Sequence, residues 1–272
     1  MAPGGWRVSA FRVFRFALCV GLTLGPIHVT CALANRYTTQ LYIDLARAPA
    51  TAAQYSRPLY DALFPAVPYC SKRIQDGYDI ALWLIGGRAI TRCLRALLAS
   101  PVGGTNYDCE RYAVVFFVHH LFMCACQVVT TLPASAGVDE CYDANPGARE
   151  TGALDWPWYG VSFLTQSFAG GRACSDMLYS GHTAVAVLSI VCGARADLKR
   201  DVIAVYYLIS FVLAAGCFAA LIACHDHYSV DVVLAAPIAV LLCTNPHIDR
   251  LGQMVGAQFR AAEVALAGEK RA

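Results

Sequence analysis

Long apolar runs alternate with short polar links along this chain of 272 residues. A helix needs about 20 mostly apolar residues to span a membrane, and several runs approach that length. Residues 202–224 carry no acidic, lysine or arginine side chain. The same holds for residues 112–132, where we interpret His119 and His120 as polar packing between helices. Weaker runs occupy residues 16–34, 80–98, 177–194 and 229–246. The pattern predicts an all-α, polytopic membrane protein with about six transmembrane helices.

Three arginines, Arg88, Arg92 and Arg95, interrupt the run 80–98. Their spacings of four and three residues place them on one helix face. Two interpretations stay open. The guanidinium groups either bind lipid phosphate within the helix bundle or snorkel to the membrane surface. Snorkelling is the favoured interpretation for Arg92 and Arg95.

The first apolar run also has two interpretations. Arg7, Arg12 and Arg15 precede it, and Ala32-Leu33-Ala34 follows its apolar core. Basic residues, an apolar core and small residues in this order are typical of a cleaved signal peptide. An uncleaved first span fits the remaining pattern better, and the orientation of the later spans is the same in both cases.

Composition agrees with a membrane location. Hydrophobic residues make up 57% of the chain and charged residues only 15%, whereas average soluble proteins carry about 25% charged residues. The net charge of +2 gives no electrostatic reason to expect nucleic-acid binding. Residues 1–272 are expected to form a single membrane domain, because no repeat or low-complexity tract divides them.

Lysine and arginine in short loops indicate the cytosolic side of a membrane protein. The N-terminal arginines, the link bearing Arg95 and Arg111, and the basic link 195–200 are therefore expected in the cytosol. The loop 133–160 carries five acidic residues against a single arginine, so it is expected on the lumenal or exoplasmic side. The tail 247–272 is expected to end in the cytosol as a short surface helix.

The chain contains 13 cysteines, many of them inside apolar runs, where cysteine behaves as a small hydrophobic residue. No Cys-x-x-Cys pair lies near other candidate ligands, so we expect no zinc site. A lumenal disulfide is possible among Cys70, Cys109, Cys141 and Cys174, and the sequence does not assign a pair.

Two polar runs stand out at the ends of one predicted helical hairpin. The first reads CSDMLYSGHT over residues 174–183, and the second reads HDHYSVDV over residues 225–232. The chain passes from the first run to the basic link 195–200 and returns through 202–224. Both runs therefore reach the same membrane face, where ionisable groups are costly and usually functional.

The residue types in these runs suit covalent phosphoryl transfer. His227 and Asp231 are four residues apart and share a helix face. A carboxylate bonded to one imidazole nitrogen leaves the other nitrogen free to attack. His182, on the facing element, can then protonate the leaving oxygen. Ser180 and Gly181 place backbone N–H groups where a phosphate would meet a helix start.

A lone interfacial histidine is more often a satisfied polar residue than a catalyst, but two such motifs on one face favour catalysis. His225 is expected outside the triad, because His227 has the required spacing to Asp231. Asp176 either contacts a cationic head group or caps the following helix.

The first run resembles the Cys-Gly-Asp-x-x-x-Ser-Gly-His-Thr motif of sphingomyelin synthases and related sphingolipid synthases. The second resembles their His-Tyr-[Ser/Thr]-x-Asp-Val motif, and both motifs occur in the wider lipid phosphate phosphatase superfamily. Pro58-Leu59-Tyr60-Asp61 and residues 129–133 resemble two further family segments. The similarity covers about residues 57–245, with a catalytic core over 174–245.

This resemblance implies a six-span helical fold with its active site on the lumenal or exoplasmic side. It implies transfer of a phospho-head-group (phosphocholine, phosphoethanolamine or phosphoinositol) from a glycerophospholipid to ceramide, with release of diacylglycerol. The head group would pass through a phospho-histidine, without a cofactor or metal. The catalytic residues implied are His182, His227 and Asp231, and the substrate-binding residues are Asp176, Ser180, Gly181 and Tyr228.

The chain departs from the family pattern at Ser175, where glycine is usual, and at Met123, where sphingomyelin synthases carry an arginine. A lipid phosphate phosphatase is the alternative, with water as acceptor. Leu221 stands where phosphatases carry an arginine that binds a phosphomonoester, which favours a diester donor. A catalytically silent lipid sensor is a third interpretation, against which the intact triad argues.

The expected partners are therefore membrane lipids, namely ceramide, a glycerophospholipid and diacylglycerol, and not nucleic acid. The expected location is a multi-pass position in the membrane of the Golgi, the endoplasmic reticulum or the cell surface. The sequence leaves open the head group, the organelle and the oligomeric state.

Overall fold

The computed structural model describes residues 5–67, 69–70, 72–104, 107–135, 137–144, 146–154, 178–194, 200–225 and 227–268. Within these ranges the regular structure is helical and no strand forms, which confirms the all-α prediction. The helices are α1 (Gly5–Arg47), α2 (Ala52–Tyr55), η1 (Phe64–Ala66), α3 (Lys72–Ala99), α4 (Asp108–Val129), α5 (Val138–Ala144), α6 (Pro146–Thr151), α8 (Gly181–Ala194), α9 (Arg200–Ala223), α10 (Ser229–Thr244) and α11 (Pro246–Gly268).

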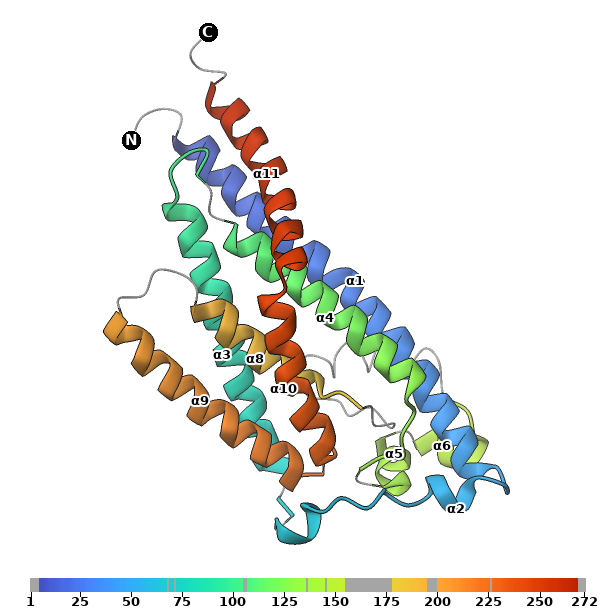
Figure 1. Ribbon diagram of the computed structural model, residues 1–272. Helices are drawn as coiled ribbons and strands as arrows, with labels where there is room; N and C mark the ends of the chain where they lie inside the picture. Colours follow the sequence, from blue (N-terminus) through green and yellow to red (C-terminus); the bar gives the residue numbers. More distant parts are fainter. Residues whose placement is uncertain are drawn as a thin grey trace.

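The long helices form an elongated bundle in which the chain passes repeatedly from one end to the other (Figure 1). Helices α1, α4 and α9 run toward the lower end of the view, and α3, α8 and α10 run back. Helix α11 continues α10 after a bend of 52°. As a result, α1 begins and α11 ends at the upper end, whereas α5 and α6 lie at the lower end.

Two described helices are long and apolar enough to cross a membrane: α4 and residues Val205–Ala223 of α9. The bent pair α10 and α11 would make a third span if it crosses as one unit, and α8 is apolar but shorter. The chain is therefore a helical membrane protein with two or three candidate spans among its described residues, compared with the about six predicted from the sequence.

Helix α8 lies at the centre of the bundle, against α3, α4, α9 and α10. Its contact with α10 uses a row of small residues, Ala235, Ala239 and Cys243, which repeat every four positions and are at most 1% exposed. Small side chains let two helix backbones approach closely inside a membrane. This close contact brings the starts of α8 and α10 together.

Helix α11 is longer than the short surface helix predicted for the tail, and it packs along α4. A Cβ atom added to Gly252 would lie 2.8 Å from Cα of Arg111, and one added to Gly256 would overlap the ring of Tyr107. Glycines four residues apart thus allow the close approach. Asp249 adds an ion pair to Arg111, with 2.6 Å between carboxylate and guanidinium.

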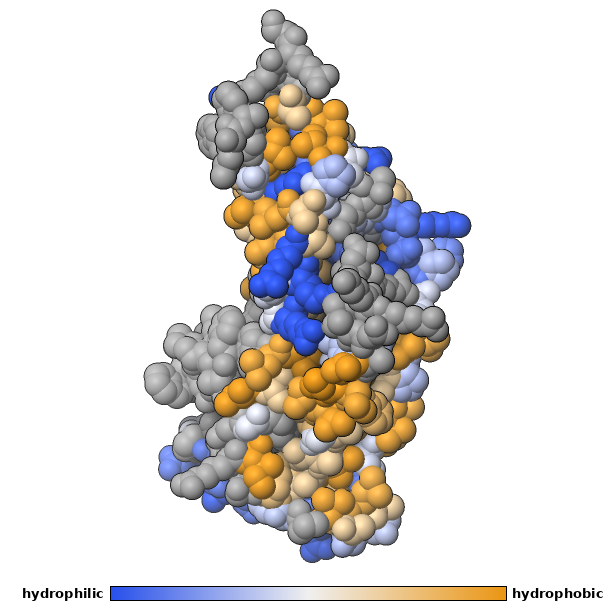
Figure 2. Space-filling model, turned by 90° about the vertical axis from the view of Figure 1, so that its left-hand side faces the viewer, coloured by the Kyte–Doolittle hydropathy of each residue, from blue (hydrophilic) through white to orange (hydrophobic). Residues whose placement is uncertain are grey.

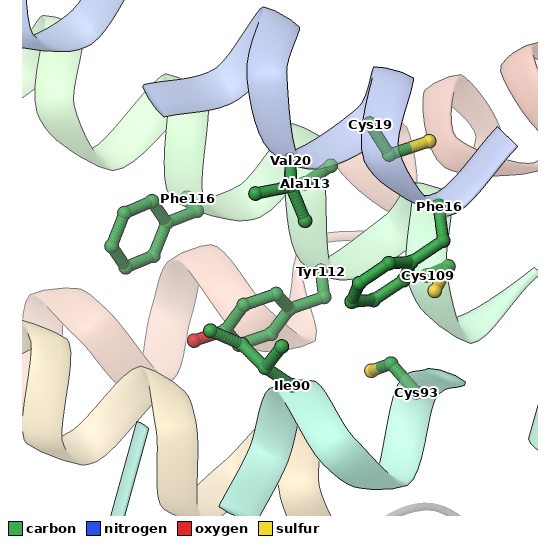
Figure 3. A pocket seen from close by; sticks show the side chains of 9 residues that line it. All are labelled: Phe16, Cys19, Val20, Ile90, Cys93, Cys109, Tyr112, Ala113 and Phe116. Carbon is green, nitrogen blue, oxygen red and sulfur yellow. The ribbon is translucent and has the colours of Figure 1, made fainter. Parts of the chain in front are cut away.

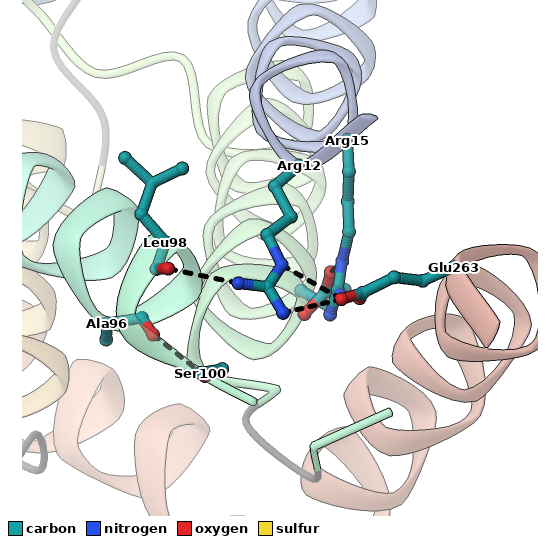
Figure 4. A network of polar contacts seen from close by, with 7 residues as sticks. Arg12, Arg15, Ala96, Leu98, Ser100 and Glu263 are labelled. Atoms are coloured by element: carbon teal, nitrogen blue, oxygen red, sulfur yellow. Dashed lines mark hydrogen bonds and ion pairs between the residues drawn. The ribbon is translucent and has the colours of Figure 1, made fainter. Parts of the chain in front are cut away.

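A buried ionic cluster joins α1, α4 and α11 at the upper end of the bundle (Figure 4). Arg12 donates to the Glu263 carboxylate at 2.9 and 2.6 Å and to the Leu98 carbonyl at 3.0 Å. Arg15 pairs with Glu110 and approaches Glu263 at 3.6 Å. Removing one member would leave a buried charge without compensation, which costs about 3–5 kcal/mol. These N-terminal arginines therefore pack the bundle, besides marking the side of the membrane.

The disulfide whose two cysteines are both described contains one of the four candidates from the sequence. Cys70 pairs with Cys224, which the sequence analysis treated as part of an apolar run. Cys109 is a free, buried thiol, so its place among the lumenal disulfide candidates was wrong. Cys141 is also disulfide-bonded, and Cys174 lies outside the described residues.

Candidate functional site

Ser180, in the first motif, caps the N-terminus of α8. Ser180 accepts the Thr183 N–H on its hydroxyl oxygen at 3.3 Å, which satisfies a free donor of the first turn. A Cβ atom on Gly181 would lie 2.6 Å from the sulfur of Met123, so glycine allows α8 to start directly against α4. Met123, the departure from the family pattern, therefore packs against the motif itself.

Two further contacts hold the residues before α8 against α4. The Tyr179 hydroxyl hydrogen-bonds Nδ1 of His119 at 3.0 Å, and both side chains are fully buried. The Leu178 N–H donates to the Thr130 hydroxyl at 3.3 Å. His119 is thus a polar packing residue between helices, as the sequence analysis interpreted it.

The second motif forms the first turn of α10. The Asp231 carboxylate accepts the N–H of Tyr228 at 3.1 Å, while the Asp231 N–H donates to the Tyr228 carbonyl at 3.1 Å. Reciprocal bonds of this kind fix a helix start. They hold Asp231 fully buried, with His227 only 9% exposed just before the helix.

The two motifs meet directly at the starts of α8 and α10. The Ser180 N–H donates to the backbone carbonyl of Asp231 at 3.3 Å. The ring centroids of His182 and His227 are 5.8 Å apart, and Nδ1 of His227 lies 3.9 Å from Oδ2 of Asp231. His182 is exposed, so a ligand can reach the pair from outside the bundle.

This geometry suits a histidine nucleophile whose ring is oriented by a carboxylate. The 3.9 Å separation of His227 and Asp231 is longer than a hydrogen bond. Catalytic hydrogen bonds are often long before substrate binds and tighten in the complex. With Nδ1 turned toward Asp231, Nε2 of His227 is the nitrogen that would attack. His182, on the other helix, has its ring centroid 5.8 Å from that of His227, a separation that would let both rings contact one bound group.

The loop between α2 and α3 supplies a residue that the sequence analysis did not recognise as part of the site. The Asp61 carboxylate accepts the N–H of Ser229 at 2.5 Å, the Ser229 hydroxyl at 2.9 Å and the N–H of Leu63 at 2.8 Å. Asp61 is 7% exposed. A carboxylate from a distant loop therefore caps the start of α10, two residues from His227.

Tyr228 links the same loop to the residues after α4. Its hydroxyl donates to the Pro133 carbonyl at 3.1 Å and accepts the Leu59 N–H at 2.8 Å. Its ring also faces Phe64, with 5.8 Å between centroids. These contacts give Tyr228 a positioning role, although the sequence analysis placed it with the substrate-binding residues.

His225 lies beside the site and belongs to its supporting structure. Its backbone has a φ of 55°, an uncommon value for a residue other than glycine. The Ser135 hydroxyl donates to its carbonyl at 2.7 Å, and Phe64 stacks on its ring at 4.0 Å between centroids. These contacts hold the turn that leads from α9 into His227.

Other features of the candidate site are limited. Asp176 lies outside the described residues. No group of three or more His, Cys, Asp or Glu side chains in the described ranges is arranged to hold a metal ion.

An apolar cavity with an open volume of about 460 Å³ lies between α1, α3 and α4, but no residue of either histidine motif lines it (Figure 3). Its lining residues are Phe16, Cys19, Val20, Ile90, Cys93, Cys109, Tyr112, Ala113 and Phe116.

Asp61→Asn should destabilise the protein. Burial alone would raise the pKa of Asp61, but hydrogen bonds from the Ser229 N–H, the Leu63 N–H and the Ser229 hydroxyl outweigh it and lower the pKa. The carboxylate therefore stabilises the fold above its unfolded pKa of about 4. We expect a loss of about 1–3 kcal/mol at pH 7, seen as a lower unfolding temperature in detergent micelles.

The matched control for this variant is Asp139→Asn, which removes a carboxylate whose side chain is 88% exposed. It should leave the unfolding temperature nearly unchanged. The difference between the wild-type protein and Asp61→Asn should shrink as the pH falls through the lowered pKa, because Asp61 is then protonated. Equal unfolding temperatures for both variants at pH 7 would contradict the capping role.

Comparison with known proteins gives this site a family context. Residues 173–248 match the family described as PAP2 superfamily C-terminal. The chain is 24% identical over 229 residues to phosphatidylcholine:ceramide cholinephosphotransferase 2 of Rattus norvegicus, covering 79% of this chain and 57% of that protein. It is 30% identical over 142 residues to phosphatidylcholine:ceramide cholinephosphotransferase 1 of Gallus gallus, covering 49% of this chain and 31% of that protein.

The chain thus spans just over half the length of the first of these relatives and about a third of the second. The matched region 173–248 contains both histidine motifs and helices α8, α9 and α10. Residues 173–248 of this chain are therefore similar to the PAP2 superfamily C-terminal family, and the chain is similar to these two phosphatidylcholine:ceramide cholinephosphotransferases.

Proposed function

We propose that this protein transfers a phospho-head-group from a glycerophospholipid to ceramide and releases diacylglycerol. The observation that carries the proposal is the convergence of His182, His227 and Asp231 at the starts of α8 and α10. The names of the relatives, phosphatidylcholine:ceramide cholinephosphotransferases, supply the substrate class. Phosphocholine, phosphoethanolamine and phosphoinositol are the candidate head groups.

The first half of the reaction forms a phospho-histidine. Nε2 of His227 attacks the phosphorus of the donor lipid, and the bond from phosphorus to the diacylglycerol oxygen breaks. Protonated His182 gives its proton to that oxygen, so neutral diacylglycerol leaves. Asp231 stabilises the positive charge that develops on the His227 ring. The head group then remains bonded to Nε2 of His227.

The second half returns the enzyme to its starting state. His182, now neutral, removes the proton from the primary hydroxyl of ceramide. The ceramide oxygen attacks phosphorus and the bond to His227 breaks, which yields a ceramide phosphodiester. His182 carries the proton needed for the next cycle. One residue thus acts as acid and then as base, in keeping with microscopic reversibility.

The start of α8 provides contacts for the phosphate oxygens. Backbone N–H groups at a helix N-terminus favour an anion, and Ser180 and Gly181 lie at this one. Asp176 precedes them in the chain and is our candidate for contact with a cationic head group. Tyr228 acts through the loops that its hydroxyl joins.

We further propose that α1, α3, α4, α8, α9 and α10 are six membrane spans. Their alternating directions support this, because each brings the chain to the opposite end of the bundle (Figure 1). The acidic loop 133–160 and the basic link 195–200 support a position of the histidines on the lumenal or exoplasmic side. The proposed location is the Golgi, the endoplasmic reticulum or the cell surface.

The decisive test asks whether a lipid acceptor is required. The purified protein would be placed in vesicles of phosphatidylcholine, phosphatidylethanolamine and phosphatidylinositol, with and without labelled ceramide, and the lipids resolved by mass spectrometry. We expect a ceramide phosphodiester and diacylglycerol in equal amounts, and neither product without ceramide after the first turnover. The mass of the new lipid identifies the head group.

Phosphatidic acid in parallel vesicles tests the alternative. Phosphate release from it, with no ceramide product, would replace the synthase by a lipid phosphate phosphatase. Leu221 argues against that outcome, because it stands where phosphatases carry an arginine and is only 1% exposed in an apolar cluster. No product from any of these lipids would reject both enzymes.

A further inference from the structure

The apolar cavity between α1, α3 and α4 has no part in the reaction proposed above (Figure 3). Its walls include Phe16 of α1, Ile90 of α3 and Phe116 of α4. The Tyr112 ring also lines it, but the Tyr112 hydroxyl hydrogen-bonds the Ser189 hydroxyl on α8 at 3.2 Å. A water molecule needs about two to four polar partners to occupy a cavity. The lining residues therefore suit a hydrocarbon group and not water.

Hydrocarbon chains surround this bundle. Figure 2 shows that much of the face on which α9 lies is hydrophobic. On α9, the exposed fractions of Leu208, Ile209, Phe211 and Val212 are 51–70%. Because a lipid chain is already in apolar surroundings outside the protein, its transfer into the cavity gains little hydrophobic free energy. What the cavity adds is a limited space, so it can select a chain by length and shape.

The cavity and the candidate site lie along one face of α4. Phe116 and Met123 are seven residues apart, which is two helical turns, so their side chains point to the same side. Both pack against the same two clusters of buried apolar residues. Met123 also lies against Gly181, directly before His182. A line of apolar contacts therefore leads from the histidines to the cavity.

The distance between the two matches the length of a lipid chain. Along α4, at 1.5 Å per residue, Phe116 lies about 10 Å and Cys109 about 21 Å from Met123. Along α8, Ser189, the partner of Tyr112, lies about 10 Å beyond His182. The chains of one leaflet extend over about 15 Å, half of a bilayer's hydrocarbon core. A chain whose polar end lies at the histidines therefore ends at the cavity.

We propose that this cavity binds the end of one hydrocarbon chain of the lipid that reacts at the histidines. The identity of that lipid rests on the proposed function, whereas the cavity and its position do not. A chain of the right length fills the cavity while its polar end reaches His227. The residues at the starts of α8 and α10 thus handle the head group, and the space between α1, α3 and α4 selects the chain.

Photocrosslinking of the purified full chain tests the site without requiring turnover. Ceramide or phosphatidylcholine, with a diazirine at the end of one long acyl chain, would be placed in vesicles and illuminated. Mass spectrometry would then identify the labelled peptides. We expect adducts on the parts of α1, α3 and α4 that line the cavity. A diazirine next to the acyl carbonyl should instead label peptides nearer the histidine motifs.

Two variants of the lining should act in opposite directions. Ala113→Phe fills the cavity and should reduce labelling of its walls by the chain-end probe about tenfold. Ile90→Ala enlarges the cavity and should favour longer chains when ceramides of increasing length compete with the probe. Damage to the fold would not produce opposite effects. Ala125→Phe, at an exposed position on α4, is the matched control and should leave labelling unchanged.

Phosphatidylserine with the same chain-end probe tests for a lipid that does not react. We expect it to label the cavity far less than ceramide or phosphatidylcholine. Equal labelling by phosphatidylserine would overturn the assignment to a reacting lipid. No adduct on the cavity walls from any probe, or equal labelling of Ala113→Phe and Ala125→Phe, would overturn the proposal altogether. A protein that shows the expected labelling but forms no ceramide product would keep the chain site and lose only the proposed reaction.

Discussion

His227→Ala should lower head-group transfer to ceramide by at least about a thousandfold, because it removes the atom that would bond to phosphorus. His227 is 9% exposed and lies before the first turn of α10, whose capping bonds come from Asp61 and Tyr228. The variant should therefore keep the fold. The measurement is the initial rate of ceramide phosphodiester formation, with thermal unfolding as a check on folding.

The covalent intermediate provides a second readout. Wild-type protein given donor lipid without ceramide should gain the mass of one head-group phosphate on His227, and His227→Ala should not. His247→Ala, an exposed histidine on α11, is the matched control and should keep the wild-type rate. A folded His227→Ala protein that still transfers would remove His227 from the mechanism. A wild-type protein that transfers without any adduct would replace the phospho-histidine by direct transfer.

The core of the candidate site could be predicted because its signals are local. His227 and Asp231 are four residues apart at the start of α10, with His227 just before the helix, and His182 lies at the other end of the same hairpin. The four-residue spacing and the predicted hairpin are enough to predict that these three side chains lie close together. Asp61 could not be found this way, because it reaches Ser229 from 168 residues away. A carboxylate in a loop looks the same whether it caps a remote helix or faces water.

The helices were predicted where their residues are apolar throughout. The predicted runs 112–132 and 202–224 correspond to α4 and α9, which begin within four residues of those positions. The first helix is longer than the predicted run 16–34. Its residues from Gly5 onward include arginines, and arginines in a sequence usually indicate a solvent-exposed segment. Their partners Glu110 and Glu263 lie far along the chain. Long-range ion pairs make polar segments helical and buried without any local pattern.

Helix α11 and the disulfide show the same limit. Gly252 and Gly256 weaken a helix in isolation, but they allow close packing once α4 is present. Cys224 ends an apolar run, and in such a run the sequence pattern indicates a small hydrophobic residue and not a disulfide partner. Only the fold brings Cys70 to it across 154 residues. Each of these features depends on a partner that the local sequence does not contain.

The Cys70–Cys224 disulfide links the loop that carries Asp61 to the end of α9. The Cys70 N–H also donates to the Ala223 carbonyl at 2.9 Å, so the covalent and hydrogen-bonded links are adjacent. The chain then continues through His225 to His227. A crosslink over 154 residues removes much conformational freedom from the unfolded chain. The disulfide therefore stabilises the fold and fixes the turn that leads from α9 into the second histidine motif.

Replacing both cysteines, as Cys70→Ser with Cys224→Ser, should cost about 2–5 kcal/mol. The midpoint of thermal unfolding in micelles should fall by about 5–15 °C under oxidising conditions. Transfer should also decrease, because the Asp61 loop is then held to α10 by hydrogen bonds alone. Cys126→Ser, which changes a free thiol on α4, is the control and should unfold near the wild-type temperature. If the double variant unfolded at the wild-type temperature, the disulfide would not stabilise the fold, and the hydrogen bonds of Asp61 and Tyr228 alone would have to hold the loop in place.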